Sequence, residues 1–311
     1  MRGCEVLKFD FSKGEGVSIN VLKPVKVKVM NNIIEVVSIQ RVCRGLENVL
    51  RLSKIHYMIL DTGEVLEYNL SENRADNIAG LKDTFRKVRD LINTNFKGGE
   101  NELHLTLTYR ENMKDIKQLY NDFKDFWKRY KYKYGDDIDY LSVIEPQGRG
   151  AWHCHVLIRH NDGMKVFIPS NDLEKLWGHG FIKIKSLKGV DNIGAYLSAY
   201  LCDVELTNEN FKDVVGTHIE IKEVDVQGTK KRFIKGGRLH MYPSGMNLYR
   251  SSKGIVFPEV KEVEYKEVKK IVGSAKPDYT RTITIIDDED DNKILNQITY
   301  EHYNMKRKNL K

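Results

Sequence analysis

A short hairpin constrains the fold of this chain more than any other segment. Residues 139–145 (DYLSVIE) and 151–159 (AWHCHVLIR) both have the composition of β-strands. The five residues 146–150 between them form a connection short enough to join two antiparallel neighbours. The hairpin therefore predicts an antiparallel sheet in this part of the chain.

The second strand of this hairpin carries a His-x-His pair. Because side chains alternate along a strand, His153 and His155 are expected on one face and Cys154 on the other. The short turn brings Glu145, on the first strand, across from the two histidines. Two imidazoles and one carboxylate can form a His2Glu metal site, although two hydrogen-bonded structural histidines and a solvated glutamate would give the same pattern.

Strands and helices alternate on both sides of the hairpin. The segment ELHLTLTY alternates strictly, with His104, Thr106 and Thr108 pointing away from its leucines. Apolar residues at helical spacing predict several helices. The expected elements are a helix over 75–96, a strand over 102–109, a helix over 113–131, a helix over 171–177, a strand over 181–187 and a helix from the N-cap Asp191 to about Cys202. From residue 102 the order is β-α-β-β-α-β-α, which predicts an α+β fold.

Three segments are distinguished by their patterns. Residues 1–74 are rich in short β-strands and include a hairpin around Asp61-Thr62-Gly63, residues 75–205 form the predicted catalytic domain, and residues 206–311 form a mixed C-terminal extension. The extension contains an acidic run, DDEDD, and ends in the basic segment MKRKNLK.

The composition favours a protein of the reducing cytoplasm with a polyanionic partner. The net charge is +7, and the four cysteines form no C-x-x-C pair. The N-terminus lacks the apolar core of a signal peptide, and no apolar run is long enough for a membrane span. We therefore expect a cytoplasmic protein that does not enter the membrane.

Two tyrosines lie on one face of the last predicted helix. Tyr196 and Tyr200 in NIGAYLSAYLCD are separated by four residues. With 16 tyrosines in the chain, packing in the core is the plainer interpretation of this pair alone. In combination with an upstream metal hairpin, the two phenols supply the parts of a phosphoryl transfer to tyrosine.

A phenol, with a pKa near 10, is a poor nucleophile at neutral pH and needs a polarised phosphate and nearby positive charge. A divalent metal would supply the first. Arg149, Lys183 and Lys185 are the candidates for the second and for contacts with DNA.

Three ordered segments, LHLTLTY, AWHCHVLI and GAYLSAYL, resemble the motifs of the HUH endonucleases, specifically the replication initiators of rolling-circle plasmids and filamentous phages. The resemblance covers roughly residues 80–205, and residues 238–258 resemble the segment that follows the catalytic domain in such proteins.

The resemblance implies a ferredoxin-like antiparallel sheet, similar to that of RNA-recognition domains, with helices on one face. It further implies that His153, His155 and Glu145 hold Mg²⁺ or Mn²⁺. A tyrosine would attack single-stranded DNA at an origin hairpin, retain the 5′ phosphate and free a 3′-OH. The order of attack is left open, with Tyr200 preferred as the initiating nucleophile and Tyr196 as its partner.

In one respect the chain departs from this family. Many relatives carry a lysine three residues after a tyrosine, whereas the equivalent positions here are Ala199 and Asp203. Since the chain contains no GxxxxGK[ST] motif, a host helicase is expected to unwind the DNA for a host polymerase.

Three alternatives use the same residues differently. A conjugative relaxase or a transposase would share the tyrosine chemistry. A metal-dependent hydrolase would use Glu145, His153 and His155 without the tyrosines. A non-catalytic nucleic-acid-binding module would share the strand order alone.

Overall fold

The computed structural model divides the chain into two compact units. One consists of residues 1–28, 34–72 and 260–305, and the other of residues 29–33, 73–259 and 306–311. The structure describes residues 8–13, 17–40, 49–51, 56–59, 65–67, 78–147, 150–202, 204–205, 221–226, 229–234, 242–243, 246–286 and 294–308.

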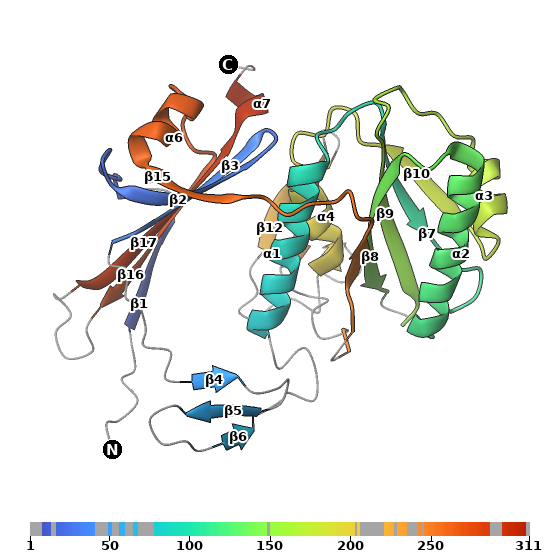
Figure 1. Cartoon of the computed structure of the whole chain (residues 1–311), viewed down its shortest axis with the longest axis horizontal. Coiled ribbons are helices and arrows are strands. Elements are labelled where there is room, and N and C mark those ends of the chain that lie inside the picture. Colours follow the sequence, from blue (N-terminus) through green and yellow to red (C-terminus); the bar gives the residue numbers. More distant parts are fainter. Residues whose placement is uncertain are drawn as a thin grey trace. The chain divides into compact units, whose positions relative to one another are not determined.

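The second unit is built on a five-stranded antiparallel sheet with the order β10-β7-β9-β8-β14 (Figure 1). Its strands are β7 (Glu102–Leu107), β8 (Ile138–Pro146), β9 (Trp152–His160), β10 (Ile182–Ser186) and β14 (Tyr249–Ser251). Numbered along the chain, the first four strands lie in the order 4-1-3-2, which is the ferredoxin-like arrangement. The predicted α+β class and the predicted hairpin of β8 and β9 are confirmed.

Two helices cover one face of this sheet and two lie on the other side. Helices α2 (Ile116–Tyr134) and α3 (Ser170–Trp177) pack on the first face, whereas α1 (Ile78–Asn95) and α4 (Ile193–Cys202) lie across the sheet from them (Figure 1). The β-α-β-β-α-β-α order predicted from residue 102 is confirmed. The sequence explains α2 well, because the Asp115 carboxylate accepts hydrogen bonds from the backbone N–H groups of Lys117 and Gln118 at its N-terminus.

The predicted start of α4 was wrong by one residue. Asn192, rather than Asp191, is the N-cap, because its side-chain oxygen accepts a hydrogen bond of 2.9 Å from the backbone N–H of Ala195. Both residue types cap helices well, so composition alone did not separate them.

The alternation predicted for the segment ELHLTLTY decides what each face of the sheet carries. Leu103, Leu105 and Leu107 belong to the main hydrophobic core together with Cys154 and Val156 of β9. The polar residues of the same strands therefore point to the opposite face, which carries the candidate site.

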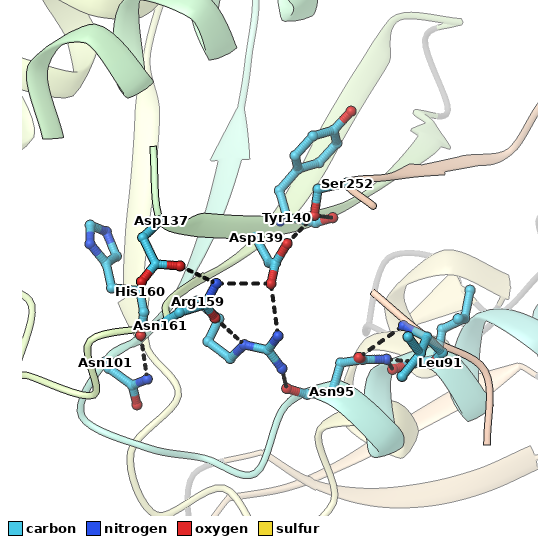
Figure 2. Close-up of polar contacts among 11 residues, drawn as sticks. Leu91, Asn95, Asn101, Asp137, Asp139, Tyr140, Arg159, His160, Asn161 and Ser252 are labelled. Carbon is cyan, nitrogen blue, oxygen red and sulfur yellow. Dashed lines mark hydrogen bonds and ion pairs between the residues drawn. The ribbon is translucent and has the colours of Figure 1, made fainter. Parts of the chain in front are cut away.

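A polar network joins the edge of this sheet to α1 and to the segment after β14 (Figure 2). The Arg159 guanidinium donates to Asp139 (2.8 Å), to the side chain of Asn161 (2.9 Å) and to the backbone carbonyl of Asn95 (2.6 Å). The Ser252 hydroxyl donates to the second oxygen of Asp139 at 2.7 Å. Because these residues come from α1, β8, β9 and the chain after β14, the network fixes the far end of the sheet.

The first unit contains a six-stranded sheet with the order β1-β16-β17-β3-β2-β15. Its apolar core includes Val25, Val27, Ile34 and Val36 beneath Val268 of helix α6 (Tyr265–Val272). The strands are β1 (Lys8–Lys13), β2 (Pro24–Met30), β3 (Ile33–Ile39), β15 (Val260–Glu264), β16 (Tyr279–Ile286) and β17 (Ile294–Asn304), and the chain ends in α7 (Met305–Lys308).

Two three-stranded sheets complete the described elements. Their orders are β4-β5-β6 and β11-β13-β12. Strands β5 and β6 pair as expected for the hairpin around Asp61-Thr62-Gly63, although the turn residues themselves, like the run DDEDD, lie outside the described residues. The strands are β4 (Val49–Arg51), β5 (His56–Ile59), β6 (Val65–Glu67), β11 (Val204–Glu205), β12 (Ile221–Val226) and β13 (Thr229–Ile234). No helix in the described part of the chain combines the length and apolar character needed to cross a bilayer.

Candidate active site

The strand register gathers the polar residues of the central sheet on one face. Directly opposed residues in antiparallel strands project to the same side. The opposed pairs are Glu145 with His153, His155 with Thr106, Thr106 with Lys183, and His104 with Lys185. Four neighbouring strands, β8, β9, β7 and β10, thus contribute side chains to one polar surface.

A continuous chain of contacts runs across this surface. His155 Nε2 contacts a carboxylate oxygen of Glu145, and His155 Nδ1 lies 3.0 Å from His104 Nε2 and 3.4 Å from the Thr106 hydroxyl. The rings of His104 and His155 are stacked with their centroids 5.3 Å apart. Glu145, His155 and His104 are all buried, so their polar atoms must satisfy one another.

The surroundings keep both stacked imidazoles neutral at neutral pH. Burial, reinforced by the positive charge of Lys185, lowers the pKa of His155 to about 4. Burial also holds the pKa of His104 well below its ordinary value, with smaller contributions from His155, Lys185 and Lys183. A neutral imidazole has a lone pair available, which is the form that binds a metal ion.

The two predicted ligands Glu145 and His155 are in contact, and His153 lies beside them. The His153 ring is partly buried and its Nδ1 lies 3.1 Å from the Gln147 amide nitrogen. Within the described ranges, no group of three or more His, Cys, Asp or Glu side chains is placed to hold a metal ion. As a donor set, two imidazoles and one carboxylate on one face suit a divalent cation.

Tyr196 faces the same cluster from α4. Its ring packs edge-on against His104, with centroids 6.2 Å apart, and its buried hydroxyl oxygen accepts a hydrogen bond of 2.9 Å from Lys185 Nζ. The second predicted nucleophile, Tyr200, lies one turn further along α4, and its side chain is outside the described residues. The predicted DNA contact Arg149 is also outside them, whereas Lys183 is exposed on the site face.

A close approach between two helices sets the position of α4. The backbone N–H of Gly194 donates to the Asn93 side chain of α1 at 3.0 Å. A Cβ at Gly194 would lie 2.6 Å from that side-chain oxygen and 2.8 Å from Arg89 Cγ, so only glycine permits this spacing. The glycine therefore helps to place Tyr196 over the sheet.

Sequence reasoning missed three polar neighbours of the site, namely His104, Thr106 and Gln147. The alternation of ELHLTLTY already put His104 and Thr106 on the face opposite the leucines. What was missing was the information that β7 pairs with β9 on one side and β10 on the other. Once that order is known, His104 lies between the histidine hairpin and Lys185.

The arrangement combines a carboxylate–imidazole pair, a second imidazole, a phenol and an ammonium group on one surface. Comparison with curated proteins and with solved structures gave no match to this chain. Residues 102–205 match a family model of replication-associated proteins of the ORF2 type, and this segment runs from β7 through α4 and includes every described residue of the site. The match supports a replication-initiator family for this part of the chain.

Proposed function

We propose that this protein initiates rolling-circle replication by nicking and rejoining single-stranded DNA through a covalent 5′-phosphotyrosine intermediate. The observation that carries the proposal is the position of the Tyr196 hydroxyl, which shares one face of the sheet with His155 and Glu145 and is linked to them through His104. The family match of the same segment supports a role in replication.

Glu145, His153 and His155 are the proposed ligands of a divalent cation, Mg²⁺ or Mn²⁺. When bound, such a cation polarises a phosphate oxygen and stabilises the charge that develops on the leaving oxygen. His104 and Thr106 contact the Nδ1 side of His155 and so orient the ring with Nε2 toward the carboxylate. Support of this kind from neighbouring side chains is typical of histidine ligands.

The reaction is a transesterification at phosphorus. The phenolic oxygen of tyrosine forms a bond to the scissile phosphorus while the bond from phosphorus to the 3′ oxygen breaks. The phenol loses its proton, and the departing 3′ oxygen gains one to become a 3′-OH. Lys185 donates to the phenolic oxygen of Tyr196 and so stabilises negative charge as it forms there.

Two tyrosines one helical turn apart allow two successive transfers. The first attack leaves the 5′ phosphate on one tyrosine and a 3′-OH that can prime synthesis by a host polymerase. A second attack, by the other tyrosine, releases and closes the displaced strand. Tyr196 and Tyr200 are the proposed pair, and a host helicase is the proposed source of unwinding.

The experiment is a search for a tyrosine-linked adduct. Single-stranded DNA that carries the origin of the protein's own replicon, labelled at its 3′ end, is incubated with the full chain and Mn²⁺ or EDTA. We expect a covalent protein–DNA species in Mn²⁺ that mass spectrometry assigns to Tyr196 or Tyr200. Replacing both by Phe should abolish it, whereas Tyr132→Phe is a matched control because Tyr132 is 96% exposed on α2.

The rival functions give different results in the same assay. A metal-dependent hydrolase would cleave DNA in Mn²⁺ without an adduct, and the double Phe variant would remain active. A binding module would retain DNA in EDTA and cleave nothing under any condition. Either result would refute the proposed tyrosine chemistry.

A further inference from the structure

Edge strand β10 carries three large side chains on the face of the candidate site. Ile182 and Ile184 point into the apolar side of the sheet, where Ile182 is buried in the core. By strand alternation Phe181, Lys183 and Lys185 project to the opposite face. The hydrogen bond of 3.0 Å from the Thr108 backbone N–H to the Phe181 carbonyl extends the β7–β10 ladder, so Phe181 follows the same alternation.

Each of these side chains lies in line with a residue of the site. Lys183 pairs with Thr106, which pairs in turn with His155. Extending both registers by one residue places Phe181 beside Thr108 and Thr108 beside His153. Since neighbouring strands are about 4.8 Å apart, Phe181 and Lys183 lie two strands, or about 10 Å, from the histidine hairpin.

The three side chains differ in exposure, and the difference separates their roles. Lys185 is partly buried and is engaged with Tyr196. Phe181 is 61% exposed, and Lys183 is exposed as well. In the part of the chain that the structure describes, no carboxylate forms an ion pair with Lys183 and no strand pairs with the outer edge of β10. An exposed aromatic ring and a lysine thus flank an open route to the site.

We propose that Phe181 and Lys183 form a subsite for single-stranded DNA, in which a base stacks on the Phe181 ring and a neighbouring phosphate contacts Lys183. This inference rests on the proposed function and adds the path by which the strand crosses β10 to reach the site. An aromatic face can receive only an unstacked base, which single-stranded DNA offers and a duplex does not. The pairing of an aromatic ring with a cation matches the alternating bases and phosphates of that ligand.

The chain supplies a close control on the other side of the same sheet edge. Phe167 is 84% exposed and, with Lys165 and Lys188, lines a groove of about 350 Å³. The same groove is lined by Leu103 and Ile184, which point away from the site face. Phe167 therefore has the same chemistry as Phe181 and a similar basic setting, but it does not face the site.

The test measures binding of fluorescein-labelled oligothymidylate to the full chain by anisotropy in EDTA, so that no cleavage occurs. Phe181→Ala should weaken binding by about tenfold or more, the effect expected for loss of one base–aromatic stack. Phe181→Trp should restore affinity and Phe181→Leu should not, because only the former keeps a stacking surface. Lys183→Gln should reduce the slope of log Kd against log salt by about 0.7, as for one lost phosphate contact.

Two results would overturn the subsite. One is unchanged affinity in Phe181→Ala, and the other is an equal loss in Phe167→Ala, which would indicate non-specific association. The adduct assay of the wild-type chain is independent of this measurement. If wild-type protein forms no adduct while Phe181→Ala still weakens binding, the proposed chemistry fails and the DNA subsite is supported.

Discussion

The polar network around Asp139 allows a quantitative prediction (Figure 2). Asp139→Asn preserves the shape of the side chain but removes its charge, leaving Arg159 without its anionic partner. A hydrogen bond to a charged group contributes about 1.5–3 kcal/mol to folding. Because the Asp139 and Arg159 side chains are 11% and 24% exposed, water replaces part of the loss. We expect the variant to lose about 2 kcal/mol of unfolding free energy, or roughly 30-fold in the unfolding equilibrium constant.

The pH dependence of this loss identifies its cause. Burial alone would raise the pKa of Asp139, but hydrogen bonds from Ser252, Asn161 and Arg159 outweigh burial and lower it below 3.8. A carboxyl whose folded pKa is depressed stabilises the fold above its unfolded pKa, and this contribution is lost as the pH falls through the folded value. The difference between wild type and variant should therefore be constant from about pH 6 to 8 and shrink below about pH 4.

The measurement is urea denaturation of the full chain at several pH values. Asp136→Asn is the matched control, because Asp136 pairs with Lys131 at 2.7 Å but is 87% exposed. An exposed pair of this kind contributes about 0.5 kcal/mol or less. If Asp139→Asn is no more destabilising than the control, or if its effect does not change at low pH, the account of the network is wrong.

Three further predictions concern the site itself. Gly194→Ala should lower the unfolding free energy by about 1–2 kcal/mol and slow adduct formation, because its Cβ would press on Asn93 and displace α4; unchanged denaturation and adduct kinetics would contradict this. Lys185→Gln should slow adduct formation at pH 7 by about tenfold and move its pH profile upward, with recovery in Lys185→Arg, since the cation rather than the hydrogen bond is at issue; an unchanged profile would exclude that role. Glu145→Gln should raise the Mn²⁺ concentration needed for nicking by at least about tenfold relative to the exposed control Glu111→Gln, and an equal requirement in both variants would remove Glu145 from the proposed ligands.

Local sequence patterns predicted the elements of the central sheet but not their neighbours. Periodicity separated the leucines of ELHLTLTY from His104 and Thr106, and the short turn predicted the pairing of β8 with β9. Pairings between distant segments leave no such signal. Residues 8–13 pair with residues 281–286 in the six-stranded sheet, and nothing in either segment specifies the other.

The same reasoning explains why the sequence named Lys185 without assigning it. Three basic residues were candidates for charge near the tyrosines, and the motif lysine is replaced by Ala199 and Asp203. The choice depends on two tertiary facts, the register that pairs Lys185 with His104 and the close helix contact at Gly194 that brings Tyr196 over His104. A one-residue slip of β10 would send Lys185 into the apolar face and Ile184 to the phenol. A cation beside the phenol can therefore come from a strand as well as from the tyrosine helix, provided that the sheet register is maintained.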